Sequence, residues 1–438
     1  MNNSIQDTFH FRLTQLFALI FPICPAWSSI LIVLVSVNWI IGLGFKGLIR
    51  EHFKILPFIL FAGFFVLYLL GLFWTKNMDK GFSELETKLS LIVLPFVFFT
   101  VPLTKDQLRA VLKSFVVGCA LAMITWLLFA TYNLCLTKYY ISQGNKIWNF
   151  DLNFFLSAYI LKYEMLGGKK IWDFGVNFFL KDRLSIIVHP SYMAMYLSFA
   201  IWMIYKVEIP LFKSRKLKMV LYSLFILSII LLVSKAGIII LILIGGFMLY
   251  EMIFKHKKAL KAISIVLLIC MAFGSLFVFA PHFRYRFTNS FTAMTSKENN
   301  YTADESTGSR MAVWKASKEI IKQNFLIGTG TGSSNDALTE SYKKDGMIVA
   351  LKEHLNAHNQ YLQTFITLGV FGLLWLLIVL LFPLQLAIAG KDMIYVGFLL
   401  IIIINIFVES MFETQAGVMF FAFFNAILFM NLLQKQKL

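Results

Sequence analysis

Residues 219–254 read MVLYSLFILSIILLVSKAGIIILILIGGFMLYEMIF, two apolar runs with few charges joined by almost no loop. A helix needs about 20 apolar residues to cross the hydrocarbon core of a bilayer. Runs of this kind recur along the chain, which is 59% hydrophobic and 14% charged with a mean hydropathy of +0.75. Most side chains therefore need a solvent other than water. We predict an all-α polytopic membrane protein with about twelve transmembrane helices.

Apolar segments of membrane length divide the chain. The expected spans are 12–24, 27–45, 55–74, 84–101, 107–134, 190–206, 219–233, 236–254, 262–280, 359–382, 393–409 and 415–433. Pro22 and Pro25 interrupt the first of these, and charged residues begin the fourth. The N-terminus lacks a small-residue cleavage site, which favours a retained first span over a removed signal peptide.

Lysine and arginine in the short loops indicate the orientation. With twelve spans they fall on one face, near residues 46–54, 105–113, 206–218, 255–261 and 435–437. The positive-inside rule makes that face cytoplasmic, so two large loops with short helices lie on the periplasmic face. We expect five regions: N-terminal membrane helices (1–134), an aromatic periplasmic loop (135–188), central membrane helices (189–280), a periplasmic catalytic loop (281–358) and C-terminal membrane helices (359–438).

The net charge of +17 is compatible with nucleic acid or with anionic lipid headgroups. The cations are spread over many short loops without a recognition helix or stacking sheet, which favours membrane lipids and argues against nucleic acid. Cys24, Cys119, Cys135 and Cys270 lie in or beside apolar segments without CxxC spacing. This pattern favours buried thiols over a disulfide framework or a metal site.

The aromatic periplasmic loop contains a local repeat. Lys146-Ile-Trp-Asn-Phe-Asp-Leu-Asn-Phe-Phe-Leu156 recurs as Lys170-Ile-Trp-Asp-Phe-Gly-Val-Asn-Phe-Phe-Leu180. Two copies are too few for a solenoid. Aromatic rings suit the membrane interface, so the repeat is either a platform for a lipid or sugar or a packing lid.

Arg310 is the strongest candidate for a substrate-binding residue in the catalytic loop. Thr307 or Ser309 can cap a short amphipathic helix whose first turn holds Arg310, with Trp314 one turn along. A guanidinium binds a diphosphate with two parallel hydrogen bonds, which lysine does not reproduce. The alternative is an arginine facing solvent or lipid headgroups.

His358 opens the next membrane helix. A helix N-terminus disfavours the imidazolium, so a neutral ring there can accept a proton near neutral pH. An ordinary polar residue at a membrane boundary is the other interpretation. His354 lies four residues earlier, but the pair lacks HExxH order and a nearby third ligand, which argues against a metal.

Further polar residues are expected on the same outer face. Lys235 sits in the short turn between two apolar runs, where a cation either reaches lipid headgroups or neutralises a specific anion. His189, Glu409 and Glu413 lie at helix entries or exits and either line the site or are ordinary interface groups. The turn 328–332 (Gly-Thr-Gly-Thr-Gly) can form a backbone nest for phosphate, but it lacks the lysine and strand of a nucleotide-binding loop.

Three blocks together resemble the O-antigen ligase and polymerase superfamily of bacterial envelope glycan transferases. Val233-Ser-Lys-Ala-Gly-Ile238 is similar to the family's Ser-Arg-Gly turn. Gly308-Ser-Arg-Met-Ala-Val-Trp314, followed by Gly332, looks like its Arg-and-Trp helix and glycine turn. His358-Asn-Gln-Tyr-Leu362 looks like its His-Asn block. The blocks span 233–372, and Lys235 replaces the family's arginine at the short turn, keeping the charge but losing the fork.

The resemblance implies a C-type glycosyltransferase-like fold in the bacterial inner membrane, with its active site on the periplasmic side. The expected reaction is metal-independent, cofactor-independent and inverting, and moves a glycan from undecaprenyl diphosphate to a hydroxyl of lipid A–core or another glycan. Arg310 and Lys235 would hold the diphosphate leaving group, and His358 would act as general base. The remaining residues expected to bind substrate are Trp314, His189, Asn359, Tyr361, Glu409 and Glu413.

Two kinds of alternative stay open. Within the superfamily, a polymerase joining repeat units or a protein O-oligosaccharyltransferase shares the donor chemistry and differs only in the acceptor. A transporter for an anionic solute belongs to a different class and usually places ionisable groups near the bilayer midplane. The polar groups of this chain gather at helix ends instead, which favours transfer over transport.

Overall fold

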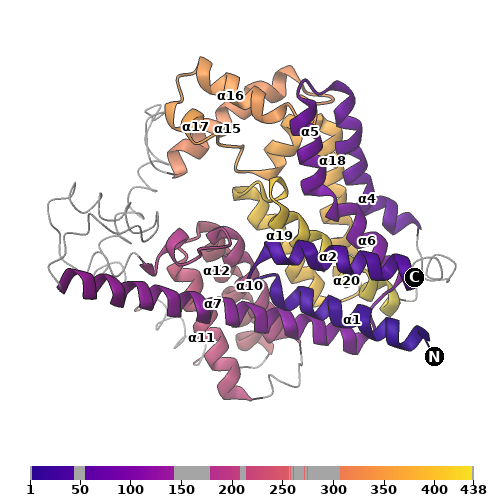
Figure 1. Ribbon diagram of the computed structural model, residues 1–438, viewed down its shortest axis with the longest axis vertical. Coiled ribbons are helices and arrows are strands. Elements are labelled where there is room, and N and C mark those ends of the chain that lie inside the picture. Colours follow the sequence, from indigo (N-terminus) through magenta and orange to yellow (C-terminus); the bar gives the residue numbers. More distant parts are fainter. Residues whose placement is uncertain are drawn as a thin grey trace. The chain divides into compact units, whose positions relative to one another are not determined.

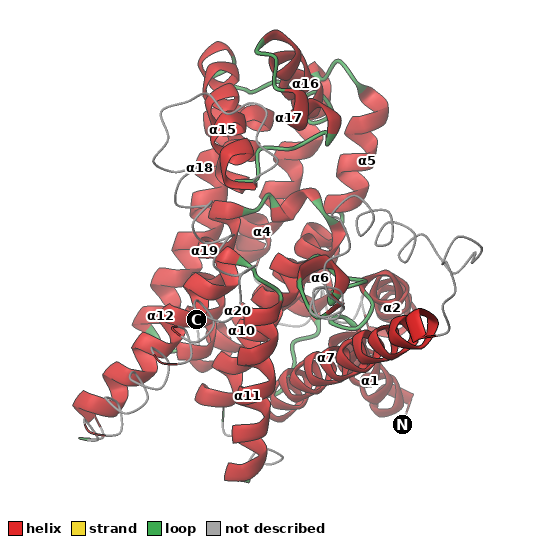
Figure 2. Ribbon diagram, turned by 90° about the vertical axis from the view of Figure 1, so that its left-hand side faces the viewer, coloured by secondary structure: helices red, strands yellow, loops and turns green. Residues whose placement is uncertain are grey.

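The computed structural model describes residues 2–43, 55–142, 178–207, 214–255 and 306–436, with a few isolated residues between 257 and 274. All regular structure within these ranges is helical, as Figure 2 shows by colour, which confirms the predicted all-α class. The span expected at 262–280, nearly all of the repeat at 146–156 and 170–180, and residues 281–305 of the catalytic loop lie outside the described residues.

Six helices within the described ranges are long and apolar enough to cross a membrane. They are Pro25–Gly42, Ile55–Trp74, Lys105–Leu136, Lys235–Lys255, Gln360–Ala389 and Gln415–Lys435. The shorter apolar helix Met393–Val408 joins them. The protein is therefore a multi-pass membrane protein, while the expected number of twelve spans stays a prediction.

The expected span at 84–101 is not one helix. Helix α5 (Met78–Lys88) ends and helix α6 (Ser90–Thr100) begins on either side of Leu89. The first helix also differs from expectation, because α1 (Asn2–Ile20) ends before Pro22 and Pro25. At the end of α1 the prolines of the sequence coincide with the break, whereas Leu89 separates α5 from α6 without a proline.

The chain folds into two compact units that interleave along the sequence. Unit 1 comprises Met1–Phe11, Ile32–Leu108 and Ile239–Leu438, and unit 2 comprises Arg12–Leu31 and Arg109–Ile238. Helices α1, α2 (Pro25–Asn38), α7 (Lys105–Ser142) and α12 (Lys235–Tyr250) contribute residues to both units.

Unit 1 is built around its C-terminal helix. Helix α20 (Gln415–Gln436) packs along α6 and is buried over nearly its whole length. Phenylalanine rings fill this contact, with centroids of Phe98 and Phe423 5.4 Å apart and those of Phe99 and Phe429 6.2 Å apart. Other elements of unit 1 are η1 (Trp39–Leu43), α4 (Ile55–Leu70), η2 (Gly71–Trp74), η6 (Glu251–Lys255), α18 (Gln360–Ala389), α19 (Met393–Val408) and η7 (Met411–Glu413).

Helix α18 is broken within its apolar sequence. Gly369 has a φ of +66°, a left-handed conformation that glycine adopts without steric cost. The amide of Val370, just past the break, donates to the carbonyl of Phe325 at 2.9 Å. A Cβ on Gly369 would lie 2.2 Å from the carbonyl oxygen of Leu326. The backbone of Phe325 and Leu326, which follows α15, therefore packs into the break.

Three helices of unit 1 form an outer group next to α18 (Figure 1): α15 (Ser306–Gln323), α16 (Ser334–Lys344) and α17 (Ile348–Lys352). They share a small apolar core that includes Val313, Leu338 and Tyr342. Burial raises the pKa of the Tyr342 hydroxyl, which donates to the carbonyl of Leu355 at 2.9 Å. This core fixes the helices that carry the candidate site.

Unit 2 packs α10 (Pro190–Lys206) against α11 (Arg215–Leu231), with the 3₁₀ turn η4 (Lys181–Arg183) preceding α10. Helix α10 is buried from Pro190 to Ile204. Glycine allows two close approaches: a Cβ on Gly118 would lie 2.1 Å from the carbonyl oxygen of Leu19, and one on Gly237 would lie 2.6 Å from Cβ of Ala194.

Candidate functional site

Three segments of unit 1 meet at one carboxylate. Arg310 lies in the first turns of α15, His358 lies just before α18, and Glu409 caps the C-terminus of α19. Arg310 Nη2 donates to Glu409 Oε1 at 2.6 Å, and His358 Nδ1 lies 3.3 Å from Glu409 Oε2. The Glu409 side chain is 7% exposed, whereas Arg310 and His358 are 20% and 25% exposed. The buried Glu409 carboxylate therefore contacts two partly exposed side chains, those of Arg310 and His358.

Trp314 fixes the chain next to His358. Its indole Nε1 donates to the carbonyl of Ala357 at 3.0 Å, and its ring meets Phe407 edge-on at 5.9 Å. Trp314 lies one turn after Arg310, so the same face of α15 positions the guanidinium and the segment carrying the imidazole.

His358 has an unusual backbone conformation. Its φ is +44°, which is uncommon for a residue other than glycine, and its amide donates to Asn356 Oδ1 at 2.9 Å. Asn359 then caps α18 by accepting from the amide of Leu362, and its own amide donates to Ser410 Oγ at 3.1 Å. The hydrogen bonds on both sides hold the histidine in this strained conformation beside Glu409.

The shared carboxylate decides which nitrogen of His358 carries the proton. An ionised carboxylate only accepts hydrogen bonds, so a neutral imidazole facing Glu409 through Nδ1 is protonated there. Nε2 then keeps its lone pair on the other side of the ring. The arrangement presents a basic nitrogen at Nε2 of His358 and the guanidinium of Arg310, each in contact with one oxygen of the Glu409 carboxylate.

Glu413 belongs to a different cluster under the same loop. Its Oε2 lies 3.3 Å from Nζ of Lys88, which also pairs with Glu84, and the Lys88 side chain is fully buried. Gln360 donates to Glu413 Oε1 at 3.1 Å and accepts from the amide of Phe412 at 2.7 Å. These contacts tie the loop after α19 to α5 and to the first turn of α18. Glu413 is thereby placed to position that loop.

The predicted phosphate nest at residues 328–332 is occupied by the protein's own chain. The amides of Thr329 and Gly330 donate to the carbonyls of Ile366 and Thr367, at 2.8 Å and 3.0 Å. The amide of Thr331 donates to Gly71 O, and that of Gly332 to the hydroxyl of Thr75. The turn therefore joins α18 to η2 and has these amides committed to the fold.

Tyr361 also has a structural contact, since its hydroxyl donates to the carbonyl of Ile403 at 3.2 Å. His354 is exposed and has a φ of +47°. Within the described ranges, no three His, Cys, Asp or Glu side chains gather as metal ligands would.

Lys235 and His189 belong to unit 2. Lys235 is half-buried at the start of α12, two residues after Val233, whose φ of +50° is strained for a β-branched residue. His189 caps α10, and its Nδ1 accepts from the amide of Ser191 at 3.4 Å. Their convergence with Arg310 stays a prediction.

A family model described as O-antigen ligase matches residues 220–377. This match supports the resemblance of that part of the chain to the O-antigen ligase and polymerase superfamily. The match contains Lys235, Arg310 and His358, the residues that carry the resemblance. A comparison with curated proteins found no match.

Two features next to the candidate site lie outside the matched residues. They are Glu409, which contacts Arg310 and His358, and the buried Lys88 cluster. Sequence reasoning named Glu409 without its partners and missed Lys88 as an organising residue. The signal for Lys88 was present, because a lysine and two glutamates at the edge of an apolar run are costly to bury unless paired.

Proposed function

We propose that this protein transfers a glycan from undecaprenyl diphosphate to a hydroxyl of lipid A–core, acting as an O-antigen ligase on the periplasmic face of the inner membrane. The observation that supports this most is the Glu409 carboxylate, which holds Arg310 and His358 together. A transferase of this type needs a cation for a departing diphosphate and a base for an incoming hydroxyl. The guanidinium of Arg310 and the imidazole of His358 provide these two groups, and both contact the Glu409 carboxylate.

His358 would act on the acceptor. Nε2 takes the proton of the acceptor hydroxyl as its oxygen forms a bond to the anomeric carbon. The resulting imidazolium is stabilised by the negative charge of Glu409 at Nδ1, as in other carboxylate–histidine pairs. Direct attack from the face opposite the leaving group inverts the anomeric centre.

Arg310 would act on the donor. As the bond from the anomeric carbon to the phosphate oxygen breaks, the electron pair leaves with the diphosphate, where negative charge grows. One guanidinium edge of Arg310 is held by Glu409, and the remaining donors can bind the phosphate oxygens. Lys235 is proposed as a second cation for the same group. The lipid diphosphate supplies the energy, so the proposal requires neither nucleotide nor metal.

A polymerase that elongates repeat units on the carrier is the nearest alternative, and a protein O-oligosaccharyltransferase is another. Both use the same donor chemistry and differ in the hydroxyl that is presented to His358. A transporter for an anionic solute would use a broken helix to line a cavity. The break in α18 at Gly369 is filled by residues 325–331, which argues for a structural role of that break.

Transfer by the purified chain tests the proposal. A lipid-diphosphate glycan is incubated with lipid A–core, and transfer to the core and elongation on the carrier are scored in parallel. Arg310→Ala and His358→Ala should each lower transfer by about 10²–10⁴-fold. Lys318→Ala on the exposed face of α15 and His354→Ala are the matched controls and should retain normal rates.

Near-normal transfer by both site variants at normal expression would refute the assignment. Elongation without transfer to core would identify a polymerase instead. Anion uptake into reconstituted vesicles that does not depend on Arg310 or His358 would support the transporter.

A further inference from the structure

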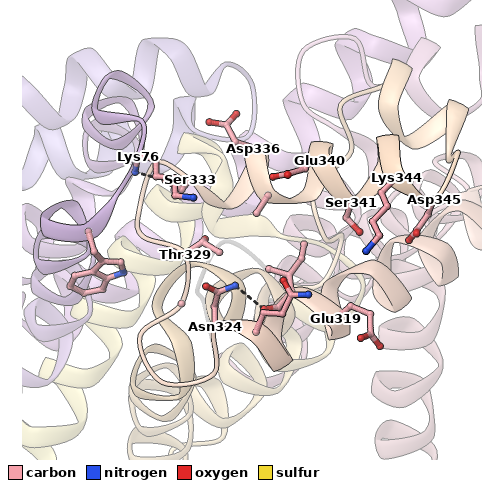
Figure 3. A pocket seen from close by; sticks show the side chains of 15 residues that line it. Lys76, Glu319, Asn324, Thr329, Ser333, Asp336, Glu340, Ser341, Lys344 and Asp345 are labelled. Carbon is pink, nitrogen blue, oxygen red and sulfur yellow. Dashed lines mark hydrogen bonds between the residues drawn. The ribbon is translucent and has the colours of Figure 1, made fainter.

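The outer group of helices borders a polar cavity that is open to solvent. It has a volume of about 660 Å³ and lies between α15, α16, η2 and the turn at residues 328–332. Arg310, His358 and Glu409 are not among its lining residues. This volume is within the range of roughly 300–1,000 Å³ typical of small-molecule sites. Figure 3 shows Ser341 and Lys344 on α16, with Asn324 and Thr329 across the gap.

Several lining side chains have polar groups not used by the fold. Among the described residues, nothing hydrogen-bonds to the side chains of Gln323, Glu340, Ser341 or Lys344. They combine an amide, a carboxylate, a hydroxyl and an ammonium group. Donors and acceptors in this mixture suit a ligand that offers many hydroxyl groups.

An aromatic residue completes the lining. Trp74 ends η2, and its indole Nε1 donates to the carbonyl of Ile327 at 3.1 Å, which fixes the ring at the cavity wall. A held indole offers an apolar face to the C–H side of a sugar ring, while neighbouring polar groups bind its hydroxyls. The lining therefore offers a carbohydrate both an aromatic face and hydrogen-bonding groups.

The charges around the cavity are nearly balanced. Four carboxylates line it, those of Glu319, Asp336, Glu340 and Asp345, with two ammonium groups, those of Lys76 and Lys344. Glu319 and Asp336 are paired with lysines outside the lining, Lys322 at 2.8 Å and Lys80 at 2.5 Å. The lining therefore has no excess positive charge that would favour a phosphate or an acidic sugar. Neutral sugars and amino sugars fit this lining.

The cavity lies well away from the candidate reaction site. On α15, Glu319 and Gln323 follow Arg310 by nine and thirteen residues. At about 1.5 Å per residue, they are roughly 14–20 Å farther along the helix axis. A ligand in the cavity can therefore be part of a glycan whose reacting end is at Arg310 only if several sugars separate the two.

We propose that this cavity is a glycan-binding subsite that holds a neutral or amino-sugar segment remote from the reacting bond. The proposal rests on the proposed function for the identity of that glycan, which is either the donor chain or the acceptor core. Binding at this subsite would favour long chains by adding contacts that do not involve the reacting sugar.

Direct binding separates this proposal from the transfer reaction. Two soluble probes are titrated into the purified full chain: O-antigen oligosaccharides of one to four repeat units released from their carrier, and delipidated core oligosaccharide. The double variant E340A/K344A should weaken binding of the probe that occupies the cavity by about tenfold, which corresponds to about 1.4 kcal/mol for the hydrogen bonds lost at the two residues together. The matched control is K343A, on α16 but not in the cavity lining.

The probe that binds more weakly to E340A/K344A than to wild type identifies the source of the glycan. If the repeat-unit oligosaccharide responds, E340A/K344A should also raise KM for long-chain donors and leave single-repeat donors unchanged. If the core oligosaccharide responds, KM for the acceptor should rise instead. Failure of both probes to bind, or equal binding of both probes by wild type and E340A/K344A, would overturn the subsite. Binding of inorganic phosphate that requires Lys344 would overturn its assignment to sugars.

The two proposals fail separately. Loss of transfer in Arg310→Ala together with unchanged oligosaccharide binding in E340A/K344A overturns only the subsite. Oligosaccharide binding that depends on the cavity, without any transfer that depends on Arg310 and His358, overturns only the proposed reaction.

Discussion

Arg310 Nη2 and Glu409 Oε1 are 2.6 Å apart although the residues are 99 positions apart in the chain. Glu409 is nearly buried, so its charge is neutralised mainly by this guanidinium. The second oxygen of the same carboxylate faces His358. One anion thus sets the position of both residues proposed to act on substrate.

Replacing Glu409 by glutamine should therefore impair turnover more than binding. The amide keeps the size of the side chain but cannot neutralise Arg310 or stabilise an imidazolium at His358. We expect kcat to fall by about 10²–10⁴-fold, with a smaller change in KM. Glu353→Gln, an exposed glutamate of the same outer group, serves as the control in the same transfer assay. Normal kcat in Glu409→Gln would contradict the role of the shared carboxylate.

The buried Lys88 should be essential for stability. Lys88→Met leaves Glu84 and Glu413 buried without their cation, and breaking a buried pair in this way typically costs about 3–5 kcal/mol. Thermal unfolding in detergent should show a large decrease in Tm. Lys80→Met on the same helix breaks an exposed pair with Asp336 and should cost only about 0.2–1 kcal/mol. Equal effects of the two substitutions would contradict the assignment.

Two glycines with nearly the same backbone angle should respond differently to alanine. Gly369 (φ +66°) would place a Cβ 2.2 Å from the carbonyl oxygen of Leu326, whereas Gly346 (φ +65°) has no atom within 4 Å of that position. Both variants carry the cost of an alanine at positive φ, and that cost is larger at Gly369, whose ψ of −161° falls in a region that essentially only glycine adopts. Only Gly369→Ala must also displace backbone, so its Tm should be clearly lower. A Tm for Gly369→Ala equal to that for Gly346→Ala would show that the break in α18 can relax.

The link between α5 and α16 should weaken in acid. Hydrogen bonds from Lys80 and Asn77 hold the pKa of Asp336 below its usual value. A carboxyl whose pKa is lowered by folding contributes stability above its unfolded value, near 3.9, and loses it as the pH falls through the folded value. The Tm difference between wild type and Asp336→Asn should therefore be constant from about pH 7 to about pH 4 and shrink below that. It should be small throughout, because the pair is half-exposed. A difference that grows in acid would contradict this sign.

Much of the site was predictable because its residues stand in recognisable blocks. Arg310, Trp314 and His358 were singled out from spacing and resemblance, and the structure brings them together. The pairing of Glu409 with two of them was not predictable, because a carboxylate at a helix exit looks the same whether it faces solvent, lipid or a partner 99 residues away. The turn at residues 328–332 was considered as a phosphate site, but its amides donate to other parts of the protein. Its glycines suit an anion nest and equally suit close contact with another segment of backbone.

The sequence by itself determined that the chain is helical and multi-pass and which superfamily residues 220–377 resemble, since long apolar runs and local motifs are properties of neighbouring residues. Tertiary structure decided which charges meet. Glu409 pairs with Arg310 and His358, Glu413 pairs with Lys88, and the glycine turn fills the break at Gly369. The physical reason is that a buried charge or amide must find a partner, and the choice among distant partners depends on how helices pack and not on their order along the chain.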